Sequence, residues 1–372
     1  MKTIYKQKAL LLLGASCLKT VSISNTWPRI FLSIFSFTVL LFSSCGEEIV
    51  KPNDIAYQFD SARYTWQVDT IPGLSFGIWA ADSEFVCIQE TSSLLIYDGN
   101  NFREILYNEF SCTYNTVTGI DRNSVYLGGQ DVSQTNYNKP KISKWNGTTL
   151  EGVIVNDTAN PRSYVSSILA INPSEIWLGA NNGRVYRYNG SSFQPYYFDT
   201  NLSVRPFFRD DQNSLYFCAT RVFGTWWQPD SHYVEVRKFT GNDWQIVYSK
   251  MLSNEEAGLS PRNVFKGIYA ISFNDIHEFD GSNFTKVLNI EPFGLMFAAE
   301  GNSINDFICW GTNGSSVKLY SWNGVKWSDE NIYHDNLETG MTITDNYIFA
   351  TVDDEIASGN TYIYKTKLER RK

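Results

Sequence analysis

One short pattern recurs six times in this chain and restricts the folds open to it. An aromatic residue is followed by a turn pair that ends in glycine, and a large apolar residue stands three positions after the glycine. The glycines are 48, 43, 51, 40 and 43 residues apart, and they are Gly99, Gly147, Gly190, Gly241, Gly281 and Gly324. This period is typical of four-stranded β units repeated around a ring, in which glycine supplies the positive φ of a tight hairpin. Aromatic residues make up 15% of the chain, which also favours an all-β fold.

A second pattern stands upstream of the glycine turns, where a short polar turn leads into three or four apolar residues. It occurs seven times, and an apolar run bounded by turns suits a strand that is covered on both faces. The third repeat shows four strands most plainly, over residues 165–171, 176–180, 184–188 and 192–198. The count predicts a seven-bladed β-propeller. A six-bladed ring is the alternative, because the fifth unit, about residues 261–290, is short.

The two ends of the chain are expected to meet in one sheet. The seventh repeat has a candidate third strand at residues 361–365, but no glycine turn or outer strand follows before Lys372. Residues 64–69 (YTWQVD) look like the outer strand 243–248 (DWQIVY) of the fourth repeat. We therefore expect residues 60–70 to supply the missing strand and close the ring, which protects edges that an open sheet would expose.

The third repeat also resembles a known class of repeats. Residues 176–190 (IWLGANNGRVYRYNG) are similar to the propeller repeats of two-component-regulator sensor ectodomains and of related Bacteroidetes surface lipoproteins. The resemblance is strong there, fair in the second and sixth repeats and loose in the others. It covers most of residues 60–368, implies a β-propeller as the architecture, and carries no catalytic residue to this chain.

The first 44 residues are predicted to be an export signal. Residues 30–42 (IFLSIFSFTVLLF) form an apolar run of 13 residues, preceded by Lys19 and Arg29 and followed by two serines and Cys45. A helix of that length spans about 20 Å, short of the roughly 30 Å core of a bilayer, which favours a signal peptide over a membrane span. Residues before about 20 hold a second signal-like segment, and we expect that translation begins downstream of them.

The residues around Cys45 resemble a bacterial lipobox, which implies that Cys45 is lipidated and becomes the mature N-terminus. Residues 45–59 would then be a lipid-anchored linker. Glu47 and Glu48 are similar to the surface-export signal of Bacteroidetes lipoproteins, which implies an outer-membrane protein exposed at the cell surface. An uncleaved anchor with an ordinary cysteine is the alternative.

The charge of the chain argues against nucleic acid as a partner. The net charge is -8, although the first 45 residues carry five basic residues and no acidic one. The remainder is therefore more acidic than the whole, whereas binding to phosphate backbones needs a basic face.

Four cysteines fall in the predicted propeller, and no two have the spacing of metal ligands. Three lie in apolar runs at the same place in the repeat, so buried thiols are the favoured interpretation for Cys87, Cys112, Cys218 and Cys309. A disulfide between Cys87 and Cys112 is the alternative, because export would permit it. We predict no metal and no cofactor.

Two connections between second and third strands are long, at residues 130–141 and 220–235. The second gathers most of the candidate ligand-binding residues, and these are Arg221, Phe223, Trp226, Trp227, His232 and Tyr233. Aromatic faces beside hydrogen-bonding groups suit a sugar ring or a protein surface. The alternative is that the aromatics fold back as a small core that caps the fourth repeat. Arg221, like Arg205 and Arg209, either attracts an anionic ligand or pairs with Asp210, Asp211 or Asp230.

The function is less constrained than the fold. The chain has no nucleophile elbow, no zinc-protease helix motif and no sialidase box. The favoured hypothesis is a non-enzymatic surface lipoprotein whose propeller binds a glycan or an envelope protein. The alternatives are a polysaccharide lyase or hydrolase with its active site at the channel mouth, and a structural module of a larger envelope complex.

Overall fold

The computed structural model describes the unit that spans residues 58–372, beginning at residue 60. Within that unit it leaves out residues 91, 108–111, 134–138, 156–162, 226–227, 254–263, 266–268, 273–274, 290–294, 314–315, 335–338, 355–359 and 369–372. The predicted signal peptide, Cys45 and the linker therefore lie outside the described residues. Every regular element in the described part is a β-strand. None of the described residues forms a helix long and apolar enough to span a membrane.

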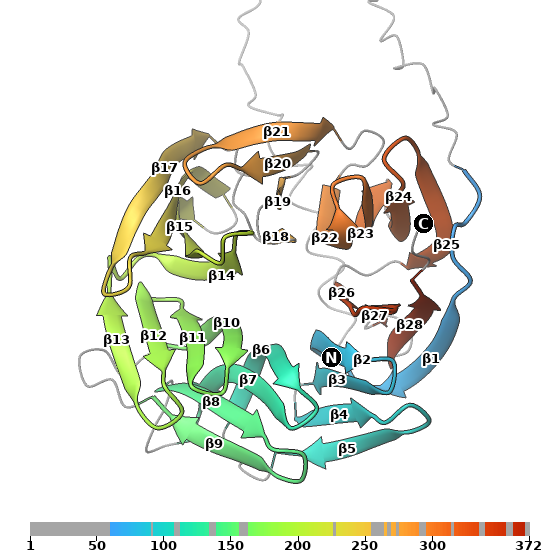
Figure 1. Ribbon diagram of the computed structural model, residues 1–372, viewed down its shortest axis with the longest axis horizontal. Helices are drawn as coiled ribbons and strands as arrows, with labels where there is room; N and C mark the ends of the chain where they lie inside the picture. The colour runs from blue at the N-terminus through green and yellow to red at the C-terminus, as the bar shows by residue number, and fades with distance from the viewer. Residues whose placement is uncertain are drawn as a thin grey trace, which may run out of the picture. The chain divides into compact units, whose positions relative to one another are not determined.

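The described strands form seven sheets of four antiparallel strands each, which Figure 1 shows arranged around a common centre. Blade one comprises β2 (Ser75–Asp82), β3 (Phe85–Glu90), β4 (Ser93–Tyr97) and β5 (Phe102–Leu106). Blade two comprises β6 (Cys112–Asp121), β7 (Ser124–Asp131), β8 (Lys139–Trp145) and β9 (Leu150–Ile154). Blade three comprises β10 (Val165–Asn172), β11 (Glu175–Ala180), β12 (Arg184–Tyr188) and β13 (Phe193–Tyr197).

The remaining blades follow the same strand order, except at the end of the chain. Blade four comprises β14 (Ser203–Arg209), β15 (Leu215–Thr225), β16 (Gln228–Phe239) and β17 (Trp244–Ser253). Blade five comprises β18 (Val264–Phe265), β19 (Tyr269–Ser272), β20 (Asp275–Phe279) and β21 (Phe284–Asn289). Blade six comprises β22 (Leu295–Ser303), β23 (Asp306–Asn313), β24 (Ser316–Trp322) and β25 (Trp327–His334). Blade seven comprises β26 (Thr339–Ile343), β27 (Tyr347–Asp354), β28 (Asn360–Lys367) and β1 (Gln67–Pro72).

The prediction of seven blades is confirmed, and the six-bladed alternative is wrong because the fifth unit forms a sheet of its own. Blade three follows its predicted strand bounds to within one residue at each end. Its hairpin turn shows why the repeat ends in glycine, since Gly190 has a φ of 92°. The carboxamide oxygen of Asn189 accepts hydrogen bonds from the backbone N–H groups of Ser191 and Ser192, at 3.0 and 2.8 Å.

The hydrophobic core lies between neighbouring sheets, and the repeated aromatic residues fill it. Trp177 on β11 is completely buried at the boundary of blades three and four. Its ring centroid lies 4.7 Å from that of Phe239 and 5.2 Å from that of Trp244, both of which belong to the glycine turn of blade four. Edge-to-face pairs of this kind add to the stabilisation that burial provides.

The N-terminal strand β1 pairs with β28 in blade seven, over six residue pairs from Gln67↔Lys365 to Pro72↔Asn360. The strand begins and ends later than the predicted range of 60–70. The preceding residues lie against blade six instead, where buried Glu330 accepts hydrogen bonds from the backbone N–H groups of Arg63 and Tyr64. If the N-terminal strand closes the ring, it must pair with the last strand of the chain, as β1 does with β28. That the strand is required to hold the ring shut stays a prediction.

The four cysteines of the propeller are free and buried, so the alternative of a disulfide between Cys87 and Cys112 is wrong. Both belong to one hydrophobic cluster between blades one and two. Burial raises the pKa of the thiols of Cys87, Cys218 and Cys309, which keeps them in the uncharged form.

Candidate functional site

Blade four departs from the other blades at the place where we expected a binding loop. Residues 220–225 and 228–235 are strand and not the expected loop, because β15 and β16 continue through them as one extended hairpin, which has ten residue pairs over its whole length. The outer strand β17 follows the hairpin as far as the pair Ser231↔Ser253. Trp226 and Trp227, two of the predicted ligand-binding residues, lie outside the described residues. We call the parts of these strands beyond the pair Ala219↔Glu235 the blade-four extension. It comprises residues 220–225 of β15, 228–234 of β16 and 250–253 of β17.

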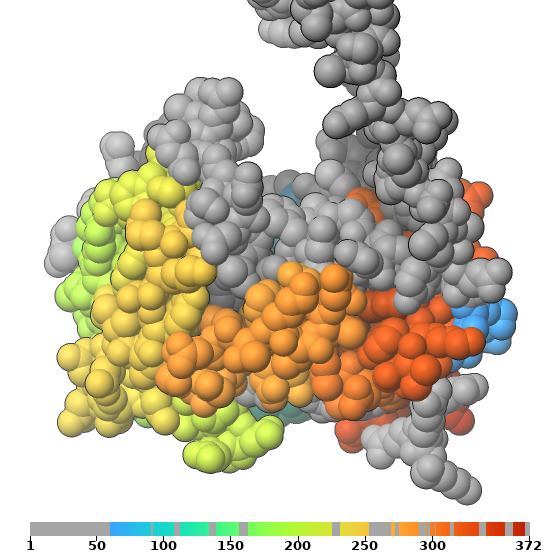
Figure 2. Space-filling model, turned by 90° about the horizontal axis from the view of Figure 1, so that it is seen from above, coloured from blue at the N-terminus to red at the C-terminus, as the bar shows by residue number. Residues whose placement is uncertain are grey.

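The extension gives blade four a longer outer surface than its neighbour. The outer strand β17 has 10 residues, whereas β21 of blade five has 6. Figure 2 shows the difference on the flank of the ring, where the yellow surface of blade four is taller than the orange surface of blade five.

The strand register assigns the residues of the extension to two faces. Arg221, Tyr233 and Met251 are opposite one another on neighbouring strands, so their side chains share one face. The next row consists of Val222, His232 and Leu252 and points to the other face. Val222 and Met251 are about half exposed, at 48% and 52%, so each face presents an apolar side chain to solvent.

His232 and Tyr233 are less accessible than a binding loop would make them. The His232 side chain is buried, at 8% exposure, and Tyr233 is half-buried against the core cluster of blades three and four. The Tyr233 hydroxyl donates a hydrogen bond of 3.0 Å to the Glu235 carboxylate. Burial and the nearby Glu235 charge raise the pKa of Tyr233, so its hydroxyl stays protonated. Tyr233 thus fits the expectation that aromatics fold back onto blade four.

Arg221 has a different partner from those the sequence suggested. Its guanidinium forms an ion pair of 3.1 Å with Asp199, which follows the last strand of blade three, and lies 4.5 Å from the ring centroid of Phe223. Asp210 is engaged elsewhere, since it accepts hydrogen bonds from Ser214 and Tyr216. The pairing with Asp199 arises because the face that carries Arg221 is turned toward blade three.

The ion pair of Arg221 and Asp199 lies at the protein surface, at the boundary of blades three and four. The pKa of the Asp199 carboxyl is held below its usual range, chiefly by hydrogen bonds from the backbone and side-chain amides of Asn201 and further by Arg221. The carboxyl is therefore ionised at neutral pH. Arg205, on the inner strand of the same blade, is exposed and lies 3.5 Å from the Tyr164 hydroxyl. Arg221, Phe223 and Tyr233 thus place a cation and two aromatic rings on one face of the extension.

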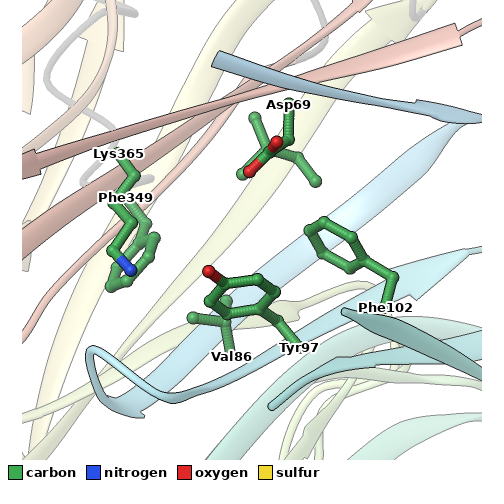
Figure 3. A pocket seen from close by; sticks show the side chains of 7 residues that line it. Asp69, Val86, Tyr97, Phe102, Phe349 and Lys365 are labelled. Atoms are coloured by element: carbon green, nitrogen blue, oxygen red, sulfur yellow. The ribbon is translucent and has the colours of Figure 1, made fainter. Parts of the chain in front are cut away.

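The pocket drawn in Figure 3 lies at the seam of blades seven and one, away from the extension. Lys365 lies over the rings of Tyr97 and Phe349, at 5.0 and 5.7 Å, and its ammonium group donates to the Ser83 carbonyl. The free volume is about 10 Å³, which is room for one water molecule. We interpret this pocket as a structural contact between blades.

Two buried carboxylates end second strands at the same seam, and both hold the fold together. Asp353 accepts hydrogen bonds from the backbone N–H of Ser75 and the hydroxyl of Thr361. Glu90 accepts a hydrogen bond of 2.5 Å from the Ser93 hydroxyl, and burial raises the pKa of Glu90. No group of three or more His, Cys, Asp and Glu residues in the described part is arranged to hold a metal ion.

One polar cluster in blade two was not predicted from the sequence. Cys112, Asp131 and Lys141 come from three neighbouring strands and meet inside the blade. Asp131 and Lys141 lie near the ends of the other long connection, residues 130–141, and Lys141 is one of three lysines in β8, so the sequence does not single it out.

No protein-family model matches the chain, and no curated protein matches it in sequence. Solved structures match across most of its length. The chain is a seven-bladed β-propeller. Virginiamycin B lyase from Staphylococcus aureus is similar with a TM-score of 0.58 and 14% identity, covering 82% of this chain and all of the lyase.

Two further propellers illustrate the breadth of these matches. YCF48 bound to D1 peptide has a TM-score of 0.56 and 12% identity, over 82% of this chain and 99% of YCF48. The extracellular domain of the putative one-component system BT4673 from B. thetaiotaomicron has a TM-score of 0.54 and 12% identity, over 81% of this chain and 40% of that one. At such identities these matches establish the fold alone.

Proposed function

We propose that this protein is a non-enzymatic binding module that uses the blade-four extension to contact a protein or glycan partner. The extension itself is the observation that carries the proposal. In a ring of repeated blades, three strands of one blade continue past the repeat and expose Val222 on one face and Met251 on the other, so the partner would contact the extension from both faces. Strand residues that serve only the ring need no such extension, and exposed apolar side chains beside charged ones suit a contact surface.

A protein partner is favoured over a glycan by the described residues. Val222 and Met251 are aliphatic, and flexible methionine side chains adapt well to protein surfaces. The glycan alternative depends on Trp226 and Trp227, whose flat rings would suit a sugar face. The two alternatives therefore assign the contact to different residues of one extension, which makes them separable by mutation.

We also propose that the module is displayed on the outer membrane. The apolar run at residues 30–42, Cys45 and the acidic residues after it support a lipidated N-terminus. The described propeller starts at residue 60, so residues 45–59 would link it to the lipid. A similar propeller is an extracellular domain, which is compatible with this location. Mass spectrometry of the mature N-terminus tests it, and an unmodified terminus upstream of Cys45 would contradict it.

An enzyme remains the second candidate, because propellers similar to this chain include a lyase. The described carboxylates give it little support. Glu90 and Asp353, which are near enough for their charges to interact, are 7% and 1% exposed and already hold structural hydrogen bonds. A polysaccharide could not reach them without opening the seam of blades seven and one.

The test compares two double variants on the same probes, a glycan array and detergent-solubilised outer membranes. Val222→Ser/Met251→Ser should abolish capture of a membrane protein if the partner is a protein. Trp226→Ala/Trp227→Ala should abolish glycan binding if the partner is a glycan. Val325→Ser is the matched control, because Val325 is 77% exposed on a turn of blade six. Full binding by both double variants would refute the extension as the contact site.

A further inference from the structure

A lysine and a cysteine are in unusually close contact inside blade two. Lys141 on β8 has a side chain only 2% exposed, and its Nζ lies 2.8 Å from the Sγ of Cys112 at the start of β6. The Oδ2 atom of Asp131, on the intervening strand β7, lies 3.8 Å from the same Nζ. A buried lysine is costly unless other groups compensate its charge, and Asp131 is one group that does so here.

The separation of the two atoms is informative. Lys141 Nζ donates a hydrogen bond to the sulfur, and the separation is shorter than the van der Waals contact of nitrogen with sulfur and longer than a direct bond between them. A single oxygen atom bonded to both would span a distance of this size. Cys87 belongs to the same hydrophobic cluster as Cys112, and Cys218 and Cys309 lie in two others, but among these four described cysteines the lysine contact is found at Cys112.

A cavity of about 170 Å³ lies between the outer parts of blades one and two, and Gly152 in its lining lies against the Lys141 side chain. Its lining includes Tyr107, Tyr114, Ser143 and Gly152. A Cβ atom at Gly152 would lie 2.6 Å from Cε of Lys141 and 3.1 Å from its Nζ. Glycine at this position therefore keeps the space beside the lysine free of a Cβ, and the cavity is large enough to admit a diatomic gas.

We propose that Cys112 and Lys141 form a covalent sulfur–oxygen–nitrogen bridge, with dioxygen from the cavity as the oxidant. The S–H bond of the thiol and one N–H bond of the neutral amine break. An S–O and an O–N bond form with one oxygen atom, and the second oxygen atom leaves as water with the two hydrogens. The thiol and the amine together lose four electrons, which reduce the dioxygen. A proton carried by the ammonium form is released to solvent.

The bridge would act as a reversible staple. It joins β6 to β8 across β7, between positions 29 residues apart, and so restricts the unfolded chain as a disulfide does. Four equivalents of a small thiol return the free cysteine and lysine, with one water and two disulfides as the other products. The stability of blade two would then depend on the redox conditions around the protein.

The experiment uses the full chain, purified without oxygen in the presence of dithiothreitol, and then divided between air-saturated and oxygen-free buffer. Protease digestion and mass spectrometry should find, only in the aerated sample, the peptides of Cys112 and Lys141 joined. The joined pair should weigh one oxygen more and two hydrogens less than the free peptides, and oxygen-18 gas should label it. The peptide of Cys87, which is in the same hydrophobic cluster, serves as the internal control and should stay unlinked.

Three results would overturn the proposal: free peptides after aeration, a joined pair without the extra oxygen, or oxidation of Cys112 without Lys141. Cys112→Ser and Lys141→Arg should both lack the bridge, and Lys141→Arg keeps the positive charge. Gly152→Ala gives a milder variant, because its methyl group presses on Lys141 and should lower the yield of the bridge several-fold. Aeration should raise the melting temperature of the natural chain by several degrees, and leave that of Cys112→Ser unchanged.

Discussion

Blades three and four are neighbours built from the same repeat, yet they differ in what their strands do beyond it. In blade three the second and third strands have 6 and 5 residues and end at the repeat. In blade four the corresponding strands have 11 and 12 residues and continue as the blade-four extension. The blades share a core through Trp177 and Trp244, so the difference is confined to the end of the hairpin. The repeat thus specifies the scaffold, and the departure from it marks the surface available for recognition.

Opening the ring should have the largest effect on the stability of both blades. Deletion of residues 60–72 removes β1, the Glu330 hydrogen bonds and the ion pair of 2.7 Å between Arg63 and Asp306. We expect loss of folding or a destabilisation of several kcal/mol, because an apolar sheet edge becomes exposed. Circular dichroism during heating measures it. An unchanged melting temperature would remove the closure argument.

The shared core of the two blades comes next. Trp177→Ala removes a fully buried ring from the boundary of blades three and four. We expect a loss of about 3–5 kcal/mol in the free energy of unfolding, measured with urea. Tyr333→Ala is the control, since Tyr333 is 69% exposed on blade six. Equal effects of the two substitutions would mean that the boundary is not the core of the molecule.

The glycine turns allow a direct comparison of the two blades. Gly190 and Gly241 have φ values of 92° and 99°, so alanine at either position should cost about 1–2 kcal/mol through its backbone conformation. A Cβ at Gly190 would also lie 3.2 Å from the Pro173 carbonyl oxygen, whereas a Cβ at Gly241 would have no atom within 4 Å of it. Urea unfolding should therefore show the larger loss for Gly190→Ala. The reverse order would contradict a purely conformational cost at Gly241.

The extension should matter for binding more than for stability. Val222→Ser/Met251→Ser changes two exposed side chains and should alter the free energy of unfolding by about 0.5 kcal/mol or less. A large loss, seen as an early unfolding transition, would show that the extension belongs to the scaffold. The difference between the two blades would then carry no functional meaning.

The smallest expected effect concerns the charge at the boundary of the two blades. The pKa of Asp199 is lower in the folded protein than in the unfolded chain, where it is about 3.9. Its carboxylate therefore stabilises the fold at pH values above the unfolded pKa, and this contribution is lost as the pH falls through the folded pKa. Asp199→Asn should therefore destabilise the protein at neutral pH and have little effect in strong acid. Urea midpoints measured across this pH range test it. A gap that widens in acid would show the opposite sign.

Much of the fold could be predicted because the repeat is a local property of the chain. The strand bounds of blade three follow from alternating apolar runs and turns, and each glycine turn needs only its own few residues. The candidate site was harder to predict. Residues 220–235 were expected to be a loop, yet Gly224 and Pro229 within them pair with each other beside a register shift that accommodates them in the hairpin. A turn former within a strand is hard to distinguish from a loop when the partner strand is unknown.

The sequence by itself determined the seven repeats, the all-β class and the positions of the glycine turns, because these depend on period and backbone preference. Only the tertiary structure decided that Arg221 pairs with Asp199 and that Lys141 meets Cys112. Such contacts depend on strand register and on how neighbouring strands and blades pack, which bring together residues 22 and 29 positions apart in these two cases. No local sequence pattern indicates such contacts, so the scaffold could be predicted from the sequence, whereas these side-chain contacts could not.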